Sequence, residues 1–317
     1  MNTVLFINSV QPSCGVYQYG KRVFDILQQS TTYSYKFCSI GSLEEYTRAI
    51  SEYNPIVIIY NYHSSTLPFL NASTICKTTL NLCIPHESAC SFANILLDID
   101  PTIQDTAHRI TLPRPLSETH TYLSPESITD REISSFIHNG TDSSIPIIGS
   151  FGFRFNNKGF TRVVQLVTQQ YDQAIIKLLI PDAHYGDPRS TPLSVMIEEF
   201  RRNITKPGIQ LQVISKFFTD DELYTFLHSN TLNIFLYDTM HGRGISSTID
   251  YALSVKKPIA ISDSYMFRHI YNDSICAYKT PLSVISAESP SYLSTFNEKW
   301  SNAKFIEKIE QLIRANL

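Results

Sequence analysis

A glycine-containing loop in the C-terminal half of the sequence has the composition of an anion-binding site. The loop follows an apolar run that ends at Tyr237, and small hydroxyl residues open the segment after it. Glycines allow a backbone to approach a ligand closely, and free amides at a helix N-terminus attract an anion such as phosphate. Arg243 adds a fixed cation, and a carboxylate at Asp250 can accept hydrogen bonds from ribose hydroxyls. The residues expected to hold such a ligand are Gly242, Arg243, Gly244, Ile245, Ser246, Ser247 and Asp250.

A second loop of this kind carries two cations. Arg154 and Lys158 follow an apolar run that ends at Phe151, and Gly159 precedes the next helical segment. Ligands of open α/β sheets bind beyond the carboxyl ends of the strands, so two cations at this place can balance a diphosphate. The alternative is ordinary surface charge beside a glycine that starts a helix.

The N-terminal half offers two further positions. His86 and Glu87 come directly after an apolar run, where a polar pair can meet a polar substrate, although a single histidine is more often structural. Gly15 opens a helical segment after the first apolar run. The pattern Gly-x-Gly-x-x-Gly is missing there, so a dinucleotide site is not expected.

Apolar runs alternate with segments of helical spacing, which predicts an α/β protein with two Rossmann-like parallel sheets. In the first half the expected strands are 3–9, 35–40, 55–62, 79–84 and 109–112, and the expected helices are 15–28 and 43–53. In the second half the expected strands are 145–151, 174–181, 209–215, 232–237 and 258–262, and the expected helices are 159–170, 193–203, 220–229 and 246–254. A long amphipathic helix, 294–315, is expected to pack back across the domains.

The motifs and their order resemble the GT-B glycosyltransferases, and most closely the retaining family four. Residues 151–159 resemble the family's Gly-Arg…Lys-Gly loop, whose Arg and Lys hold the donor diphosphate. The other similar segments are 219–223 (the helix start near the donor base), 233–237 with 242–252 (the strand and loop before Glu-x7-Glu), 257–262 (the following strand), 14–16 (the Gly-Gly loop) and 86–87 (the His-Asp pair facing the donor sugar).

The sequence departs from the family pattern at three positions. Gly242 stands where the first Glu of Glu-x7-Glu is expected, and the shorter Asp250 stands at the second. The family Arg aligns with Phe153, one residue before Arg154. The missing first Glu bears on catalysis, because in the family this side chain lies near the transferred sugar.

The resemblance implies a retaining, metal-independent transfer of a sugar from a UDP- or GDP-sugar, without another cofactor, to a saccharide, lipid-linked or protein acceptor. In that mechanism Arg154 and Lys158 stabilise the leaving diphosphate and His86 orients the sugar. The implied organisation is an acceptor-side domain at 1–120, an inter-domain segment at 121–144, a nucleotide-sugar domain at 145–290 and a C-terminal helix at 291–317. Two alternatives stay open: a degenerate GT-B protein that binds a nucleotide sugar or a partner without catalysis, and a nucleotide-sugar epimerase, for which no second acid/base pair is evident.

The composition excludes several other classes of protein. The 317 residues include 26 Lys and Arg against 29 Asp and Glu, so the basic excess typical of nucleic-acid-binding proteins is missing. No apolar run is long enough to span a bilayer and no signal-peptide pattern opens the chain, so we expect a cytoplasmic protein, with peripheral membrane contact left open. The six cysteines are expected to be reduced, with a Cys83–Cys90 disulfide as the alternative.

Overall fold

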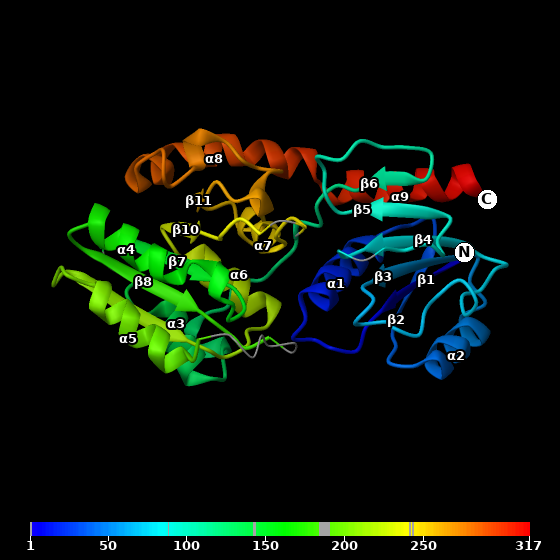
Figure 1. Cartoon of the computed structure of the whole chain (residues 1–317), viewed down its shortest axis with the longest axis horizontal. Helices are drawn as coiled ribbons and strands as arrows, with labels where there is room; N and C mark the ends of the chain where they lie inside the picture. Colours follow the sequence, from blue (N-terminus) through cyan, green and yellow to red (C-terminus); the bar gives the residue numbers. More distant parts are fainter. Residues whose placement is uncertain (1, 88, 142–143, 184–190, 241, 243) are drawn as a thin grey trace. The chain divides into compact units, whose positions relative to one another are not determined.

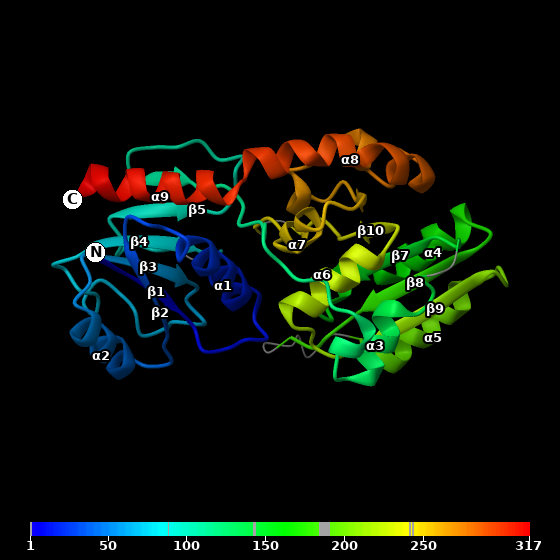
Figure 2. The same ribbon diagram turned by 180° about the vertical axis from the view of Figure 1, so that it is seen from behind.

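The computed structural model describes residues 2–87, 89–141, 144–183, 191–240, 242 and 244–317. The chain forms two compact units, which are seen from two sides in Figures 1 and 2. The first unit contains Met1–Ser117, Gly242–Ile245 and Lys299–Leu317, and the second contains Glu118–His241 and Ser246–Glu298.

The first unit is built on a parallel sheet whose described strands have the order β2-β1-β3-β4-β5-β6. The strands are β1 (Thr3–Asn8), β2 (Ser34–Ser39), β3 (Val57–Tyr62), β4 (Leu80–Pro85), β5 (Ile95–Asp98) and β6 (Arg109–Thr111). The helices of this unit are α1 (Gly15–Leu27), α2 (Leu43–Tyr53) and α9 (Asn302–Asn316).

Side chains alternate between the two faces of this sheet, as they must in a strand. Phe6 of β1 belongs to the apolar core that α1 and α9 cover, where Phe305 and Ile309 of α9 are buried. Its neighbours Leu5 and Ile7 belong to the opposite core, which α2 covers. Both faces are therefore buried, which explains why the central strands read as continuous apolar runs.

The second unit is built on a parallel sheet with the order β11-β10-β7-β8-β9. The strands are β7 (Ile147–Phe151), β8 (Ala174–Leu179), β9 (Ile209–Ile214), β10 (Leu232–Phe235) and β11 (Ile259–Ile261). The helices are α3 (Arg131–His138), α4 (Phe160–Gln170), α5 (Leu193–Asn203), α6 (Asp220–Ser229), α7 (Thr248–Ser254) and α8 (Leu282–Lys299).

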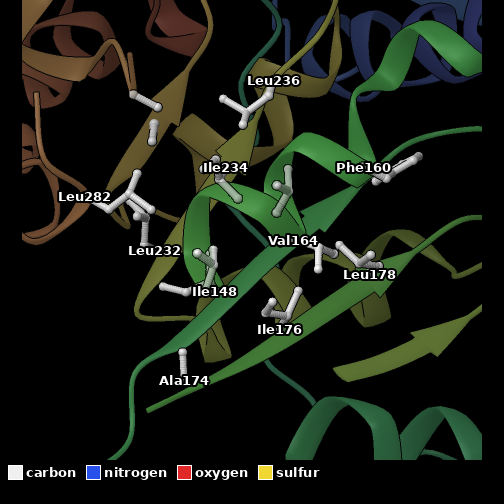
Figure 3. Close-up of a cluster of buried hydrophobic side chains, with 14 of the residues drawn as sticks. Ile148, Phe160, Val164, Ala174, Ile176, Leu178, Leu232, Ile234, Leu236 and Leu282 are labelled. Atoms are coloured by element: carbon white, nitrogen blue, oxygen red, sulfur yellow. The ribbon is translucent and has the colours of Figure 1, made fainter. Parts of the chain in front are cut away.

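One face of this second sheet carries the apolar core shown in Figure 3, to which α4, α5 and α8 contribute. On the other face, Phe136 of α3 stacks on Phe226 of α6 at a centroid distance of 5.4 Å. Lys177 of β8 is fully buried, and its Nζ donates a 2.8 Å hydrogen bond to the carbonyl of Ile137, in the last turn of α3. Burial lowers the pKa of Lys177 to about 8.

The expected alternation of strands and helices is confirmed, and helices 43–53, 193–203 and 220–229 have the expected bounds. A C-terminal helical segment is confirmed, but it consists of two helices and not of the expected single helix 294–315. Helix α8 ends at Lys299. The Ser301 hydroxyl then caps a new helix, α9, by accepting a hydrogen bond from the amide of Lys304. The α9 helix still returns to the N-terminal unit, as its apolar face predicts. Strand β5 was not expected, because its four residues are too short to show a period.

All six cysteines are free thiols. In the part of the chain that the structure describes, no helix is long and apolar enough to cross a membrane.

The buried Lys177 predicts an unusual pH dependence of stability. Between pH 8 and 10.5 the folded state loses the lysine proton while the unfolded state keeps it, so the wild-type free energy of unfolding should rise with pH in this window. By pH 10 the gain should be on the order of 2–3 kcal/mol, and Lys177→Met should lack it. Urea unfolding of both proteins at pH 7.5 and pH 10 measures the difference, and parallel pH profiles would contradict the prediction.

Candidate functional site

Arg154 lies in the loop after β7, at the carboxyl edge of the second sheet. Its amide donates to the carbonyl of Pro181 at 2.9 Å, and its guanidinium Nε lies 2.6 Å from Oδ1 of the exposed Asp182. A ligand phosphate at this position therefore has to share the guanidinium with a carboxylate. Phe153, at the position of the family Arg, instead stacks on Phe217 at 6.4 Å.

Lys158 ends a short 3-10 turn, Asn156–Lys158, in the same loop. Its Nζ lies 3.9 Å from the centroid of the Tyr237 ring, which is buried after β10. Gly152 makes room for this contact, since a Cβ there would lie 3.0 Å from the Tyr237 hydroxyl. Among the ion pairs between described residues, none involves Lys158. The ammonium group thus rests on a π face and keeps its charge available to an anion.

Gly159 joins this turn to α4 and adopts a left-handed conformation with φ of 67°. A Cβ at this position would lie 1.9 Å from the carbonyl oxygen of Leu236, so only glycine fits. Arg162, in the first turn of α4, donates to the same carbonyl at 2.5 Å and pairs with Asp238 at 2.7 Å. The N-terminus of α4 is therefore fixed to the carboxyl end of β10.

A cavity of about 270 Å³ opens beside this helix N-terminus. It is lined by Phe155, Asn156, Gly159, Phe160, Thr161, Arg162, Thr191, Met196 and Glu199. Arg162 was not predicted from the sequence, although a cation four residues after Lys158, in the first turn of a helix, is a signal that could have identified it.

The start of α7 is linked to Lys158 through Tyr237. The Tyr237 hydroxyl lies 3.0 Å from Oγ1 of Thr248, which accepts from the Ser246 hydroxyl at 3.1 Å. Ser247 is the N-cap residue of α7 and makes no side-chain capping bond. The β7 loop and the start of α7 thus meet in the second unit, where Lys158, Tyr237, Thr248 and Ser246 form one series of contacts.

Asp250 lies inside α7 and is fully buried. Its expected contact with a ribose remains a prediction. In the described residues of the chain, no group of three His, Cys, Asp or Glu side chains is arranged to hold a metal ion.

The glycine loop after β10 belongs to the first unit by its contacts. The Gly244 amide donates to Oε1 of Glu87 at 2.9 Å, and Ile245 is buried. Gly242 has a φ of 77° and open space around its Cβ position, whereas Arg243 lies outside the described residues. Gly15 opens α1 and also has no atom within 4 Å of its Cβ position.

His86 follows β4 and is buried against the edge of the Tyr19 ring, with 5.1 Å between ring centroids. Its Nε2 lies 2.6 Å from Oδ1 of Asn61. Burial, with a smaller contribution from the charges of Arg114, His63 and Arg22, lowers the pKa of His86 to about 3. His86 is consequently a neutral imidazole at physiological pH.

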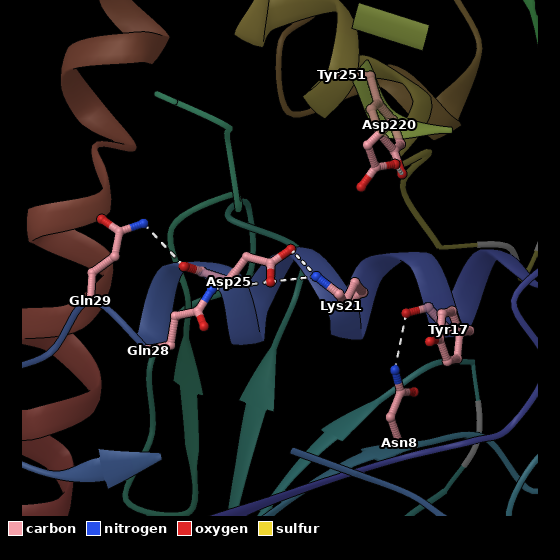
Figure 4. Close-up of polar contacts among 8 residues, drawn as sticks. All are labelled: Asn8, Tyr17, Lys21, Asp25, Gln28, Gln29, Asp220 and Tyr251. Atoms are coloured by element: carbon pink, nitrogen blue, oxygen red, sulfur yellow. Dashed lines mark hydrogen bonds and ion pairs between the residues drawn. The ribbon is translucent and has the colours of Figure 1, made fainter. Parts of the chain in front are cut away.

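Asn61 connects His86 to the first strand and to α1. Its Nδ2 donates to Oδ1 of Asn8 at 2.8 Å and to the carbonyl of Val16 at 2.7 Å. Asn8 in turn donates to the carbonyl of Tyr17 at 3.1 Å, as Figure 4 shows. Both asparagines stand at the carboxyl ends of parallel strands, a signal that the sequence analysis did not use.

Gly20 on α1 leaves room for these side chains, because a Cβ there would lie 2.4 Å from Nδ2 of Asn61. An alanine inside a helix normally stabilises by about 1 kcal/mol relative to glycine. Gly20→Ala should instead lower the free energy of unfolding by roughly 2 kcal/mol, because the amide network must shift. Gly15→Ala on the same helix is the control and should not lower stability, because nothing lies within 4 Å of its Cβ position. Urea unfolding checks both variants, and a Gly20→Ala protein as stable as wild-type would refute the close approach.

No protein-family model matches the chain, and no curated protein matches it in sequence. Among solved structures, HepE of Anabaena in complex with UDP-glucose is similar with a TM-score of 0.67 at 10% identity, over 99% of this chain and 100% of that one. AviGT4, a glycosyltransferase of avilamycin A biosynthesis, has a TM-score of 0.65 at 12% identity, over 99% of this chain and 97% of its own.

The lipopolysaccharide outer core galactosyltransferase WaaB is similar over the full length of both chains, with a TM-score of 0.60 at 11% identity. At these identities the likeness concerns the fold. The two parallel sheets with their flanking helices, together with this full-length similarity, show that the chain has the GT-B fold.

Proposed function

We propose that the protein is a glycosyltransferase that moves a sugar from a nucleotide-sugar donor to an acceptor, with retention of configuration and without a metal ion. The observation that carries the proposal is the placement of Lys158 over Tyr237, next to the hydroxyl residues that open α7. HepE, one of the similar structures, has been solved with UDP-glucose, with UDP and glucose, and with UDP alone. These ligands of HepE favour a UDP-sugar as the donor here.

The proposed diphosphate site uses the two cations of the β7 loop. Lys158 supplies a charge that no described ion pair neutralises, and Arg154 supplies a guanidinium that a phosphate can share with Asp182. Fixed cations at a leaving diphosphate stabilise the charge that develops in the transition state, and this is often the largest catalytic contribution. The amide and hydroxyl of Ser247 would add donors and Asp250 would hold the ribose, whereas the Ser246 amide already donates to the carbonyl of Met266 at 2.9 Å.

The first unit would face the acceptor, and His86 would contact the transferred sugar. The acceptor would be a saccharide, a lipid-linked molecule or a protein, and the site of action would be the cytoplasm. Gly242 provides no carboxylate, so the charge on the sugar would be stabilised by the departing diphosphate and the donors around it. The same absence favours the second candidate, a GT-B protein that binds the donor and does not turn it over.

Removing both cations tests the diphosphate site. Arg154→Ala with Lys158→Ala should lower the affinity for UDP at least about 100-fold, because each charged hydrogen bond contributes roughly 1.5–3 kcal/mol. Isothermal titration calorimetry measures the affinity, with and without EDTA, and EDTA should change nothing. Arg201→Ala with Arg202→Ala removes the same charge from the exposed end of α5 and should keep the wild-type affinity.

Equal loss of affinity in both double variants would mean that only net charge matters, and no loss in either would refute the assignment. Turnover of the bound donor, followed by NMR of the anomeric proton, separates the transferase from the binding protein. Product with inverted configuration would contradict the proposed mechanism.

A further inference from the structure

The orientation of the Asn8 side chain is determined by two backbone groups. The amide N–H of Ser9 donates to Oδ1 of Asn8 at 2.9 Å, and the carbonyl of Tyr17 accepts from its Nδ2 at 3.1 Å. A backbone N–H can only donate and a carbonyl can only accept. The oxygen and nitrogen of Asn8 therefore cannot be exchanged.

The Asn61 side chain takes its orientation from Asn8 and from α1. Oδ1 of Asn8 and the carbonyl of Val16 are both acceptors, and both lie within 2.8 Å of the same atom of Asn61. That atom must be the nitrogen Nδ2. The oxygen Oδ1 of Asn61 consequently points to His86, where it lies 2.6 Å from Nε2.

An amide oxygen has no proton to give, so the proton of this contact must sit on Nε2 of His86. Burial and the charges of Arg114, His63 and Arg22 oppose a second proton on the ring. The ring also contacts the Tyr19 ring and the amide of Asn61. No hydrogen bond between described residues uses Nδ1, and His86 retains an exposed fraction of 8%.

We propose that Asn61 is a positioning residue that holds His86 as the Nε2–H tautomer, so that Nδ1 serves as a hydrogen-bond acceptor for a hydroxyl of the donor sugar. The tautomer follows from the contacts within the first unit, whereas the role toward the sugar rests on the proposed function. An acceptor at this position favours a sugar that carries a hydrogen-bond donor there, such as a hydroxyl. A deoxy sugar or a sugar with fluorine in place of that hydroxyl leaves Nδ1 without a donor.

NMR of the wild-type protein labelled with ¹⁵N in histidine tests the tautomer without any ligand. We expect the His86 Nδ1 to resonate as an unprotonated ring nitrogen and Nε2 as a protonated one, with no titration between pH 5 and 8. The reverse assignment, or titration near the ordinary histidine pKa, would overturn the proposal.

A pair of identical substitutions tests Asn61 itself. In Asn61→Asp a carboxylate faces the Nε2–H, so titration of His86 should move upward by at least about one pH unit. Asn81→Asp is the matched control: Asn81 is a buried asparagine five residues before His86 on β4, bonded to Tyr60 and to the carbonyl of Cys76, and should leave His86 unchanged. An equal effect of both substitutions would contradict a specific contact, and if Asn61→Asp does not fold, the wild-type spectrum decides.

Analogues of UDP-glucose with one hydroxyl at a time replaced by fluorine test the contact with the sugar. One analogue should bind the wild-type protein about five- to tenfold more weakly than UDP-glucose does. The His86→Ala variant should bind that analogue and UDP-glucose with equal affinity. A series in which no fluorine position is coupled to His86 would overturn the sugar contact. Failure of UDP-glucose to bind at all would count against the proposed function, whereas the tautomer would stand on the spectrum of the free protein.

Discussion

The close approach of α4 to the carboxyl end of β10 is the constraint on which the position of Lys158 depends. It exists because residue 159 has no side chain, so the carbonyl of Leu236 can lie where any Cβ would be. Arg162 then binds the same carbonyl and Asp238, which holds the two ends together. With α4 in this place, the turn before it carries Lys158 over the Tyr237 ring. One glycine thus determines where a cation of the candidate site can be.

In the first unit, hydrogen bonds between neutral groups fix the position of His86. Asn8 and Asn61 are fully buried, and burial of an amide destabilises the folded state unless its hydrogen bonds are made. Each asparagine here bonds to backbone groups as well as to its neighbour, and Gly20 gives them space. A network of this kind is rigid, because a shift of any member leaves buried polar groups unsatisfied. Its end point is a neutral histidine at the edge of the sheet.

Much of the fold could be predicted from the sequence because it rests on local patterns. Buried parallel strands give continuous apolar runs, and capped helices such as 43–53 and 220–229 have clear starts, where Ser42 and Thr219 accept from backbone amides. Arg154 and Lys158 could be identified as candidate site residues from a local pattern as well, because they follow a predicted strand and precede a predicted helix. The break between α8 and α9 was missed because Trp300 continues the apolar face that runs into α9.

The partners of the candidate site residues could not be predicted, because they come from distant parts of the chain. Asn61 and Asn8 are 53 residues apart, and no periodicity links them. The same holds for Lys158 and Tyr237, which meet only when β7 and β10 pair in the sheet. Sequence patterns identified Lys158 and His86 as candidates. The Tyr237 ring that positions Lys158 and the asparagine amides that position His86 are brought there by the tertiary fold.

Calorimetric titration of the wild-type protein with UDP, GDP, ADP and CMP tests the central claim most directly. We predict that one nucleoside diphosphate, UDP before the others, binds with a dissociation constant of about 1 μM to 100 μM, which corresponds to a binding free energy of about −8 to −5.5 kcal/mol. A folded protein that binds none of these nucleotides would contradict it and would leave the two cations of the β7 loop as surface charge.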